Sequence, residues 1–313
     1  MITFFKTENG IMRKVDAPSP GCWINVISPD KDEIKVLTNE FNVNPEYIRY
    51  ALDEEESSRI ENEDGQTLIT VDVPLTEKND DNSVIYSTIP LGIVVMRNYV
   101  VTICTKDNAT IHEFADEMVK NVDTSLKTRF VLQLFLRMSA RYLQYLKQID
   151  RYSGFVERKL RKTMKNRELI QMLDLEKSLV YFRTSLKSDA ATIEKMARGR
   201  YLKLYEEDKE LLDDVMVEIK QAIEMANIYS NVLSETMEAL SSIISNNLNS
   251  VMKVLTSITV LMAIPTMIFS FYGMNIGETA GGLILASNTW IPLGIALVAT
   301  LLVGIWLWKK DMF

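Results

Sequence analysis

The sequence predicts an α+β domain, with a mixed sheet and helices, followed by a long helical stalk and two membrane-spanning helices at the C-terminal end. Three observations support this fold class. Six of the eight prolines lie before residue 91, and the next proline is Pro265. Segments rich in Val, Ile and Thr, which are typical of strands, occur in that proline-rich part. Two long apolar runs, 254–272 and 290–308, lie near the end of the sequence.

Residues 1–125 are predicted to form the cytoplasmic α/β domain. Residues 22–26 favour a short strand, and Asp30 and Asn44-Pro45 have the side chains that cap and open helices. Three further segments favour strands, and the last two are joined at Arg97-Asn98 like a hairpin. These segments are 67–75, 89–96 and 99–105.

Residues 126–205 are predicted to be an antiparallel helical region. Apolar residues recur at helical spacing from about Thr128 to Gly199. Gly154 and Lys165-Asn166 are the expected interruptions, so two helices are expected to run in opposite directions here.

Residues 206–272 are predicted to be one stalk helix that continues into the membrane. Neither Gly nor Pro occurs between Gly199 and Pro265, and apolar residues follow alternating steps of four and three from Leu212 to Ile258. Such a helix would be about 100 Å long. It cannot bury its apolar stripe against itself, so we expect neighbours, most simply copies of the same chain.

The runs 254–272 and 290–308 are each long enough to cross a hydrocarbon core of about 30 Å. The alternative, a pair of buried core helices, does not explain the flanks. Lys253, Lys309 and Lys310 lie at the ends expected in the cytoplasm, and the outer loop 273–289 has no Lys or Arg. We therefore expect a multi-pass protein of the cell membrane, in the lipid bilayer, with both termini and the basic tail 309–313 in the cytoplasm. No leader segment is recognisable at the start.

Composition argues against several function classes. The net charge of −7 and the pI near 5.1 argue against nucleic acid as a partner. His112 is the single histidine, so a His-rich transition-metal site is excluded and a Ser-His-Asp set would have to use it. We found no phosphate-binding Gly-rich loop, and we do not expect an enzyme. Oxygen ligands, which suit hard divalent cations, are abundant.

Small and hydroxyl side chains form a stripe on one face of the first span, at steps of three and four residues. The stripe comprises Thr256, Thr259, Ala263, Thr266 and Ser270. One interpretation is a tight helix interface, because small residues and Ser or Thr are favoured between membrane helices. The other interpretation is a pore, because a ring of bundled copies would place this face around an axis.

The first span ends in Tyr272, Gly273, Met274 and Asn275, and the upstream segment 249–256 carries Asn249 and the run Val-Met-Lys-Val-Leu-Thr. With two C-terminal spans, this arrangement resembles the CorA family of divalent-cation channels, named for its magnesium-transporting members. Segment 44–61 also resembles the cytoplasmic domain of that family, less specifically.

The resemblance implies a funnel-shaped homopentamer with an axial pore for divalent cations. It implies a selectivity filter at Gly273, Met274 and Asn275, where neutral amide oxygens would accept hydrogen bonds from a hydrated magnesium ion. Leu255 is the expected constriction, because Ala263 stands where some members carry a bulkier gate residue. The pore-lining positions are Asn249, Leu255, Thr259, Ala263, Thr266 and Ser270.

The resemblance also implies that cytoplasmic magnesium closes the channel by binding acidic residues between subunits. Asp214, at the start of the stalk helix, is the expected regulatory ligand, and Asp72 and Glu77 are the expected partners from a neighbouring α/β domain. Magnesium is thus both the transported and the regulatory ion.

Several alternatives stay open at this point. Cobalt or nickel could be carried with magnesium, and zinc-transporting relatives share the same motif. Channel conduction and proton coupling are not separated by the sequence. A membrane-anchored coiled-coil scaffold without conduction is the alternative from a different class. Glu278 is the single charge of the outer loop, which predicts only a weak attraction for cations.

Overall fold

The structure is a computed structural model that describes residues 1–313 except 79–83, 117–118, 164, 200, 274–289 and 313. The chain divides into two compact units, Met1–Glu235 and Thr236–Phe313.

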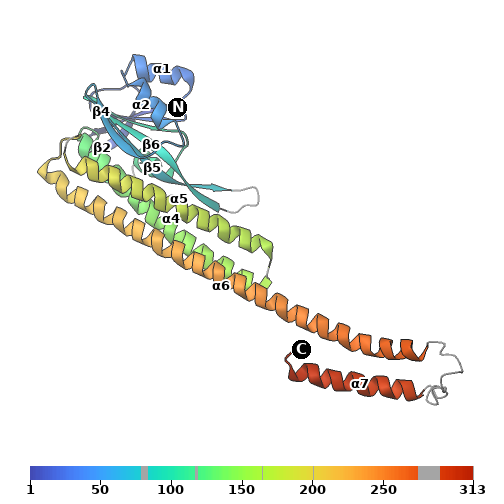
Figure 1. Cartoon of the computed structure of the whole chain (residues 1–313). Coiled ribbons are helices and arrows are strands. Elements are labelled where there is room, and N and C mark those ends of the chain that lie inside the picture. The colour runs from blue at the N-terminus through green and yellow to red at the C-terminus, as the bar shows by residue number, and fades with distance from the viewer. Residues whose placement is uncertain (79–83, 117–118, 164, 200, 274–289, 313) are drawn as a thin grey trace. The chain divides into compact units, whose positions relative to one another are not determined.

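Seven strands form one mixed sheet in the described part of the first unit (Figure 1). The order is β2-β1-β3-β7-β6-β5-β4, with β3 and β7 parallel and the other neighbours antiparallel. The bounds are β1 Ile2–Glu8, β2 Ile11–Val15, β3 Cys22–Ile27, β4 Arg59–Glu63, β5 Gln66–Lys78, β6 Val84–Val95 and β7 Tyr99–Cys104. The predicted strands and the β6–β7 hairpin are confirmed, and β1, β2 and β4 were not predicted.

Two short helices, α1 (Lys31–Asn39) and α2 (Pro45–Ala51), cover one face of the sheet. Asp30 caps α1 by accepting from the backbone amides of Asp32 and Glu33, and Asn44 caps α2 in the same way. Helix α2 lies very close to β6, since a Cβ atom at Gly92 would be 2.3 Å from that of Ala51. Only glycine therefore allows this approach.

Helices α3 (Ala109–Ala115), α4 (Lys127–Thr163) and α5 (Asn166–Ala197) belong to the opposite side of the sheet. Trp23 of β3 is fully buried there, stacks on Phe5 and packs against Phe130 of α4. Its indole Nε1 donates to Thr102 Oγ1 at 2.8 Å, which satisfies the one polar atom of that ring. The sheet is thus a central layer between two helical layers.

Helices α4 and α5 form the predicted antiparallel pair, and the break falls next to Lys165-Asn166. Gly154 does not interrupt α4, although an interruption was expected there. A glycine inside a helix costs only about 1 kcal/mol. The buried side chains of Ile149, Val156 and Leu160 on either side of it offset that cost.

Helix α6 extends from Glu206 to Tyr272 and α7 from Trp290 to Lys309. Within the first unit, one face of α6 is buried, and Ser234 Oγ donates to Glu176 Oε1 of α5 at 2.6 Å. The buried apolar residues are Leu212, Val215, Ile219, Ala222, Ala226 and Leu233. The expected neighbours of the stripe are, for this part, the chain's own α4 and α5, and copies of the chain are not needed to cover it.

In the second unit, the last part of α6 contacts α7. Ser257 Oγ donates to one of two carbonyls, those of Lys253 at 2.9 Å and Met312 at 3.0 Å, and a Cβ atom at Gly304 would meet Leu261 at 3.7 Å. Both helices contain a window long and apolar enough to cross a membrane, of which only 6% and 17% is buried. Soluble core helices would be mostly buried instead.

Candidate ion-conduction path and cytoplasmic metal site

The predicted pore-lining residues share the face of α6 that α7 leaves uncovered. Asn249, Leu255, Thr259, Ala263, Thr266 and Ser270 are all exposed. Ser257 and Leu261, on the opposite side of the same helix, make the contacts with the C-terminal segment. A face with hydroxyl groups that stays open within one chain is available to line an axis between copies.

The hydroxyl groups of this face are oriented by the helix itself. Thr259 Oγ1 donates to the carbonyl of Leu255 at 2.8 Å, and Thr266 Oγ1 donates to that of Met262 at 2.9 Å. Because each hydroxyl hydrogen is used in this way, the oxygen lone pairs remain as acceptors. Such oxygens suit the water shell of a hydrated divalent cation.

Helix α6 ends immediately before the predicted filter. Its last turn contains no basic residue, and the amide of Gly273 donates to the carbonyl of Phe269 at 2.9 Å. The C-terminal end of a helix carries partial negative charge, which favours a cation. A Cβ atom at position 273 would lie 3.3 Å from the Phe269 carbonyl oxygen, so a side chain there would crowd this end. Met274 and Asn275 lie outside the described residues.

Two of the predicted regulatory acids lie on exposed surface. Asp214 is exposed on α6, next to the buried Val215. Glu77 on β5 makes an ion pair with Lys106 at 2.9 Å. In the described residues no group of three metal-ligating side chains comes together. One chain therefore does not assemble Asp214, Asp72 and Glu77, and a site shared between subunits stays a prediction.

The third predicted acid, Asp72, is partly buried beside Asp189 of α5, which the sequence reasoning did not single out. Asp189 is fully buried, and its Oδ1 accepts from Ser58 Oγ and from the amide of Asp72, both at 2.8 Å. Its Oδ2 has no hydrogen-bond partner among the described residues. Burial raises the pKa of Asp189 well above its usual value, and the neighbouring Asp72 raises it further. Burial also raises the pKa of Asp72, although a hydrogen bond with Ser185 lowers it in part.

Replacement of Asp189 by asparagine is expected to flatten the pH dependence of stability. The folded state holds a proton that the unfolded chain releases near pH 4, so stability falls, by up to about 1.4 kcal/mol per pH unit, as pH rises toward the folded-state pKa. Thermal unfolding of the full chain in EDTA, from pH 4 to 8, measures this. The exposed Asp213→Asn variant is the control, and parallel pH curves for wild type and Asp189→Asn would contradict the expectation.

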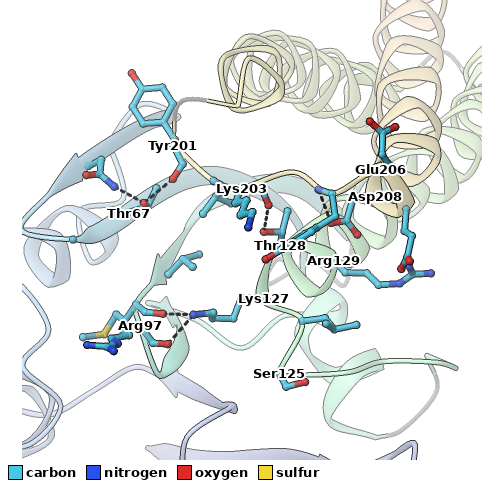
Figure 2. A pocket seen from close by; sticks show the side chains of 18 residues that line it. Thr67, Arg97, Ser125, Lys127, Thr128, Arg129, Tyr201, Lys203, Glu206 and Asp208 are labelled. Carbon is cyan, nitrogen blue, oxygen red and sulfur yellow. Dashed lines mark hydrogen bonds between the residues drawn. The ribbon is translucent and has the colours of Figure 1, made fainter.

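A cavity of about 620 Å³ lies where the β6–β7 hairpin, the start of α4 and the α5–α6 connection meet (Figure 2). Lys127 Nζ donates to the carbonyls of Met96 and Arg97 at 2.9 and 2.8 Å, and burial lowers its pKa. Thr67 and Thr128 donate to the carbonyls of Tyr201 and Lys203. The hydrogen bonds of Thr67 and Thr128 attach the α5–α6 connection to the sheet and to α4. Side chains of both charges line the cavity, so we assign it no part in ion binding.

Comparisons with known proteins agree on one family. The model of the CorA-like Mg2+ transporter protein family matches residues 20–310. The cobalt/magnesium transport protein CorA of Methanocaldococcus jannaschii is 28% identical over 288 residues, which cover 90% of this chain and 86% of that protein.

Solved structures show the same fold. The complete CorA magnesium transporter from Methanocaldococcus jannaschii has a TM-score of 0.79 at 23% identity, covering 99% of this chain and 96% of that one. The cytoplasmic domain of ZntB from Vibrio parahaemolyticus has a TM-score of 0.60 at 10% identity, over 78% of this chain and 98% of that domain. Because the family model matches most of this chain, the chain belongs to the CorA-like Mg2+ transporter protein family.

Proposed function

We propose that this protein is a channel of the CorA type that takes up magnesium across the cell membrane as a homo-oligomer, most simply a pentamer. Both termini lie in the cytoplasm in this proposal, and cobalt or nickel can replace magnesium as cargo. The observation that carries it is the uncovered hydroxyl face of α6, which leads to a helix end without basic residues directly before Gly-Met-Asn. Family membership and the relative that transports cobalt and magnesium support the same cargo class.

The membrane potential can drive this uptake without another energy source. It contributes about 2.3 kcal/mol per elementary charge for each 100 mV, and a magnesium ion carries two charges. A divalent cation therefore enters a cell with a negative interior downhill even when the outer loop attracts it weakly.

Currents through the purified full-length protein in planar bilayers test the proposal. We expect inward currents that depend on magnesium and on voltage. A non-conducting membrane-anchored scaffold would give none. Repeating the measurement at several pH values separates a channel from a proton-coupled carrier, because only the carrier's reversal potential would follow the proton gradient.

Competition among cations tests the cargo. Uptake of labelled magnesium into vesicles is expected to be inhibited by cobalt and nickel, and zinc is expected to be a poorer competitor. The described residues offer oxygen ligands along α6, and a filter of amide oxygens favours a hard, hydrated ion. Strong inhibition by zinc together with zinc transport would instead favour the zinc-transporting alternative.

Removal of the Asp214 carboxylate is expected to weaken closure by cytoplasmic magnesium. Loss of one ligand from a regulatory site that Asp214 shares with Asp72 and Glu77 of a neighbour should raise the magnesium concentration needed for closure about tenfold, the equivalent of about 1.4 kcal/mol. Magnesium-dependent protection from proteolysis of Asp214→Ala measures this. Asp213→Ala, a neighbour that is also exposed, is the control, and unchanged protection in Asp214→Ala would exclude the regulatory role.

A further inference from the structure

The turn between α4 and α5 carries the densest positive charge in the sequence. We call residues 151–163 and 165–167 the basic tip. It contains seven basic side chains, all exposed, against one carboxylate, Glu157, in a chain with a net charge of −7. The seven are Arg151, Arg158, Lys159, Arg161, Lys162, Lys165 and Arg167.

Ion pairs within the tip account for only part of this charge. Arg161 pairs with Glu157 at 2.7 Å along α4. Lys159 Nζ pairs with Glu168 Oε1 at 2.9 Å, which connects α4 to the first turn of α5 and holds the turn. Arg158, Lys162 and Lys165 make no ion pair with any described residue. Three cationic groups therefore remain available to an external anion.

Helix stability does not explain the whole cluster. Basic residues in the last turn of α4, Arg161 and Lys162, are favoured there by the helix dipole. Lys165 and Arg167 lie at the start of α5, where the dipole disfavours positive charge. Lys165 occupies the N-cap position without making any side-chain cap bond. Within the fold, the hydrogen bond from Lys159 lowers the pKa of Glu168 and the charge of Lys165 lowers it further, but Lys165 makes no ion pair with Glu168, so the ammonium group can still reach an external anion.

Large apolar side chains border the same charges. Phe155 is 53% exposed, Ile170 57% and Leu173 50%, and the ring of Phe155 stacks on that of Tyr152. Clustered Lys and Arg beside exposed aromatic and aliphatic side chains are typical of segments that bind the surface of an anionic membrane.

We propose that the basic tip binds anionic lipid headgroups at the cytoplasmic surface of the membrane. The charge of the tip is complementary to phosphate-bearing headgroups, and the bordering apolar side chains suit the headgroup region. An acidic protein segment would also match the charge, but it would leave the apolar border unexplained.

A fluorescent label on the full-length protein in nanodiscs tests this. Asn166→Cys places an exposed thiol in the tip without removing a cation, and Cys22 and Cys104 are buried and therefore protected from labelling. Nanodiscs of phosphatidylglycerol are expected to quench the label, through spin-labelled lipids, several-fold more than nanodiscs of phosphatidylcholine. The excess should disappear at 1 M salt, where the screening length is only about 3 Å. A label at Asn98→Cys should be quenched equally in phosphatidylglycerol and phosphatidylcholine nanodiscs.

Charge variants decide whether the tip itself is responsible. Arg158→Gln, Lys162→Gln and Lys165→Gln together should abolish the excess quenching, while Arg13→Gln, Lys14→Gln and Lys31→Gln, also exposed, should leave it intact. Equal quenching in both lipids, or equal loss in both triple variants, would overturn the proposal. It would also be overturned if spin-labelled polyglutamate, added to the protein in detergent, quenched the label as strongly as the spin-labelled phosphatidylglycerol nanodiscs do.

Discussion

Substitution of Asn275 by alanine is expected to reduce magnesium flux by about tenfold or more, because each hydrogen bond to the water shell contributes about 0.5–1.5 kcal/mol and several are lost together. In the proposed filter each copy of the chain presents one amide oxygen to the water shell of the ion. Alanine removes that acceptor from every copy at once. Growth of a transport-deficient host at low magnesium and flux into vesicles both measure the effect.

Two matched variants make the Asn275 result specific. Asn275→Gln keeps the amide but places it one methylene further from the backbone, so partial flux is expected. Asn288→Ala makes the same chemical change elsewhere in the predicted outer loop and is expected to leave flux near that of wild type. Full flux through Asn275→Ala, with normal amounts of protein in the membrane, would exclude the filter assignment.

Substitution of Leu255 by serine is expected to produce a channel that leaks when cytoplasmic magnesium is high. Leu255 is 57% exposed on the uncovered face of α6, close to the N-terminal end of the apolar run. A ring of leucine side chains closes a narrow pore by excluding water, and a hydroxyl side chain of smaller volume allows water to enter. Currents recorded at closing magnesium concentrations should therefore rise several-fold over those of wild type.

A leucine outside the predicted pore provides the control for Leu255. Leu302 of α7 is 64% exposed, and Leu302→Ser introduces the same hydroxyl into a span that is not predicted to line the pore. It should reduce stability without a leak. If Leu255→Ser closes as tightly as wild type, the constriction lies elsewhere on α6.

Local signals in the sequence were sufficient for much of the fold. Capping side chains such as Asp30 and Asn44 act within one turn of the chain, and the structure confirms both helix starts. The β1–β2 and β4–β5 hairpins also had local signals that we overlooked. Asn9-Gly10 and Asp64-Gly65 have positive φ angles at both residues, as tight hairpin turns require.

The remaining features depend on contacts between distant segments. Asp189 lies on a helix that looks amphipathic and ordinary in sequence, and its burial against Asp72 follows only from the docking of α5 on β5 and β6. The partial burial of the α6 stripe has the same origin. For the candidate pore, helical periodicity predicts one polar face of α6, and the residues of that face are exposed in the structure while Ser257 and Leu261 make the contacts with the C-terminal segment. That this face lines a pore stays a prediction.

The contact of Ser257 with Met312 would limit how one chain can move if the proposed channel opens and closes. The Ser257 hydroxyl is within hydrogen-bond distance of both carbonyls, those of Lys253 and Met312, and it links the first span to the segment after α7 when it donates to Met312. If the contact persists, a rotation of this part of α6 carries the tail of α7 with it. The two spans of a chain would then rotate together as one rigid unit. The proposed pore would open because the spans of one copy slide against those of its neighbours.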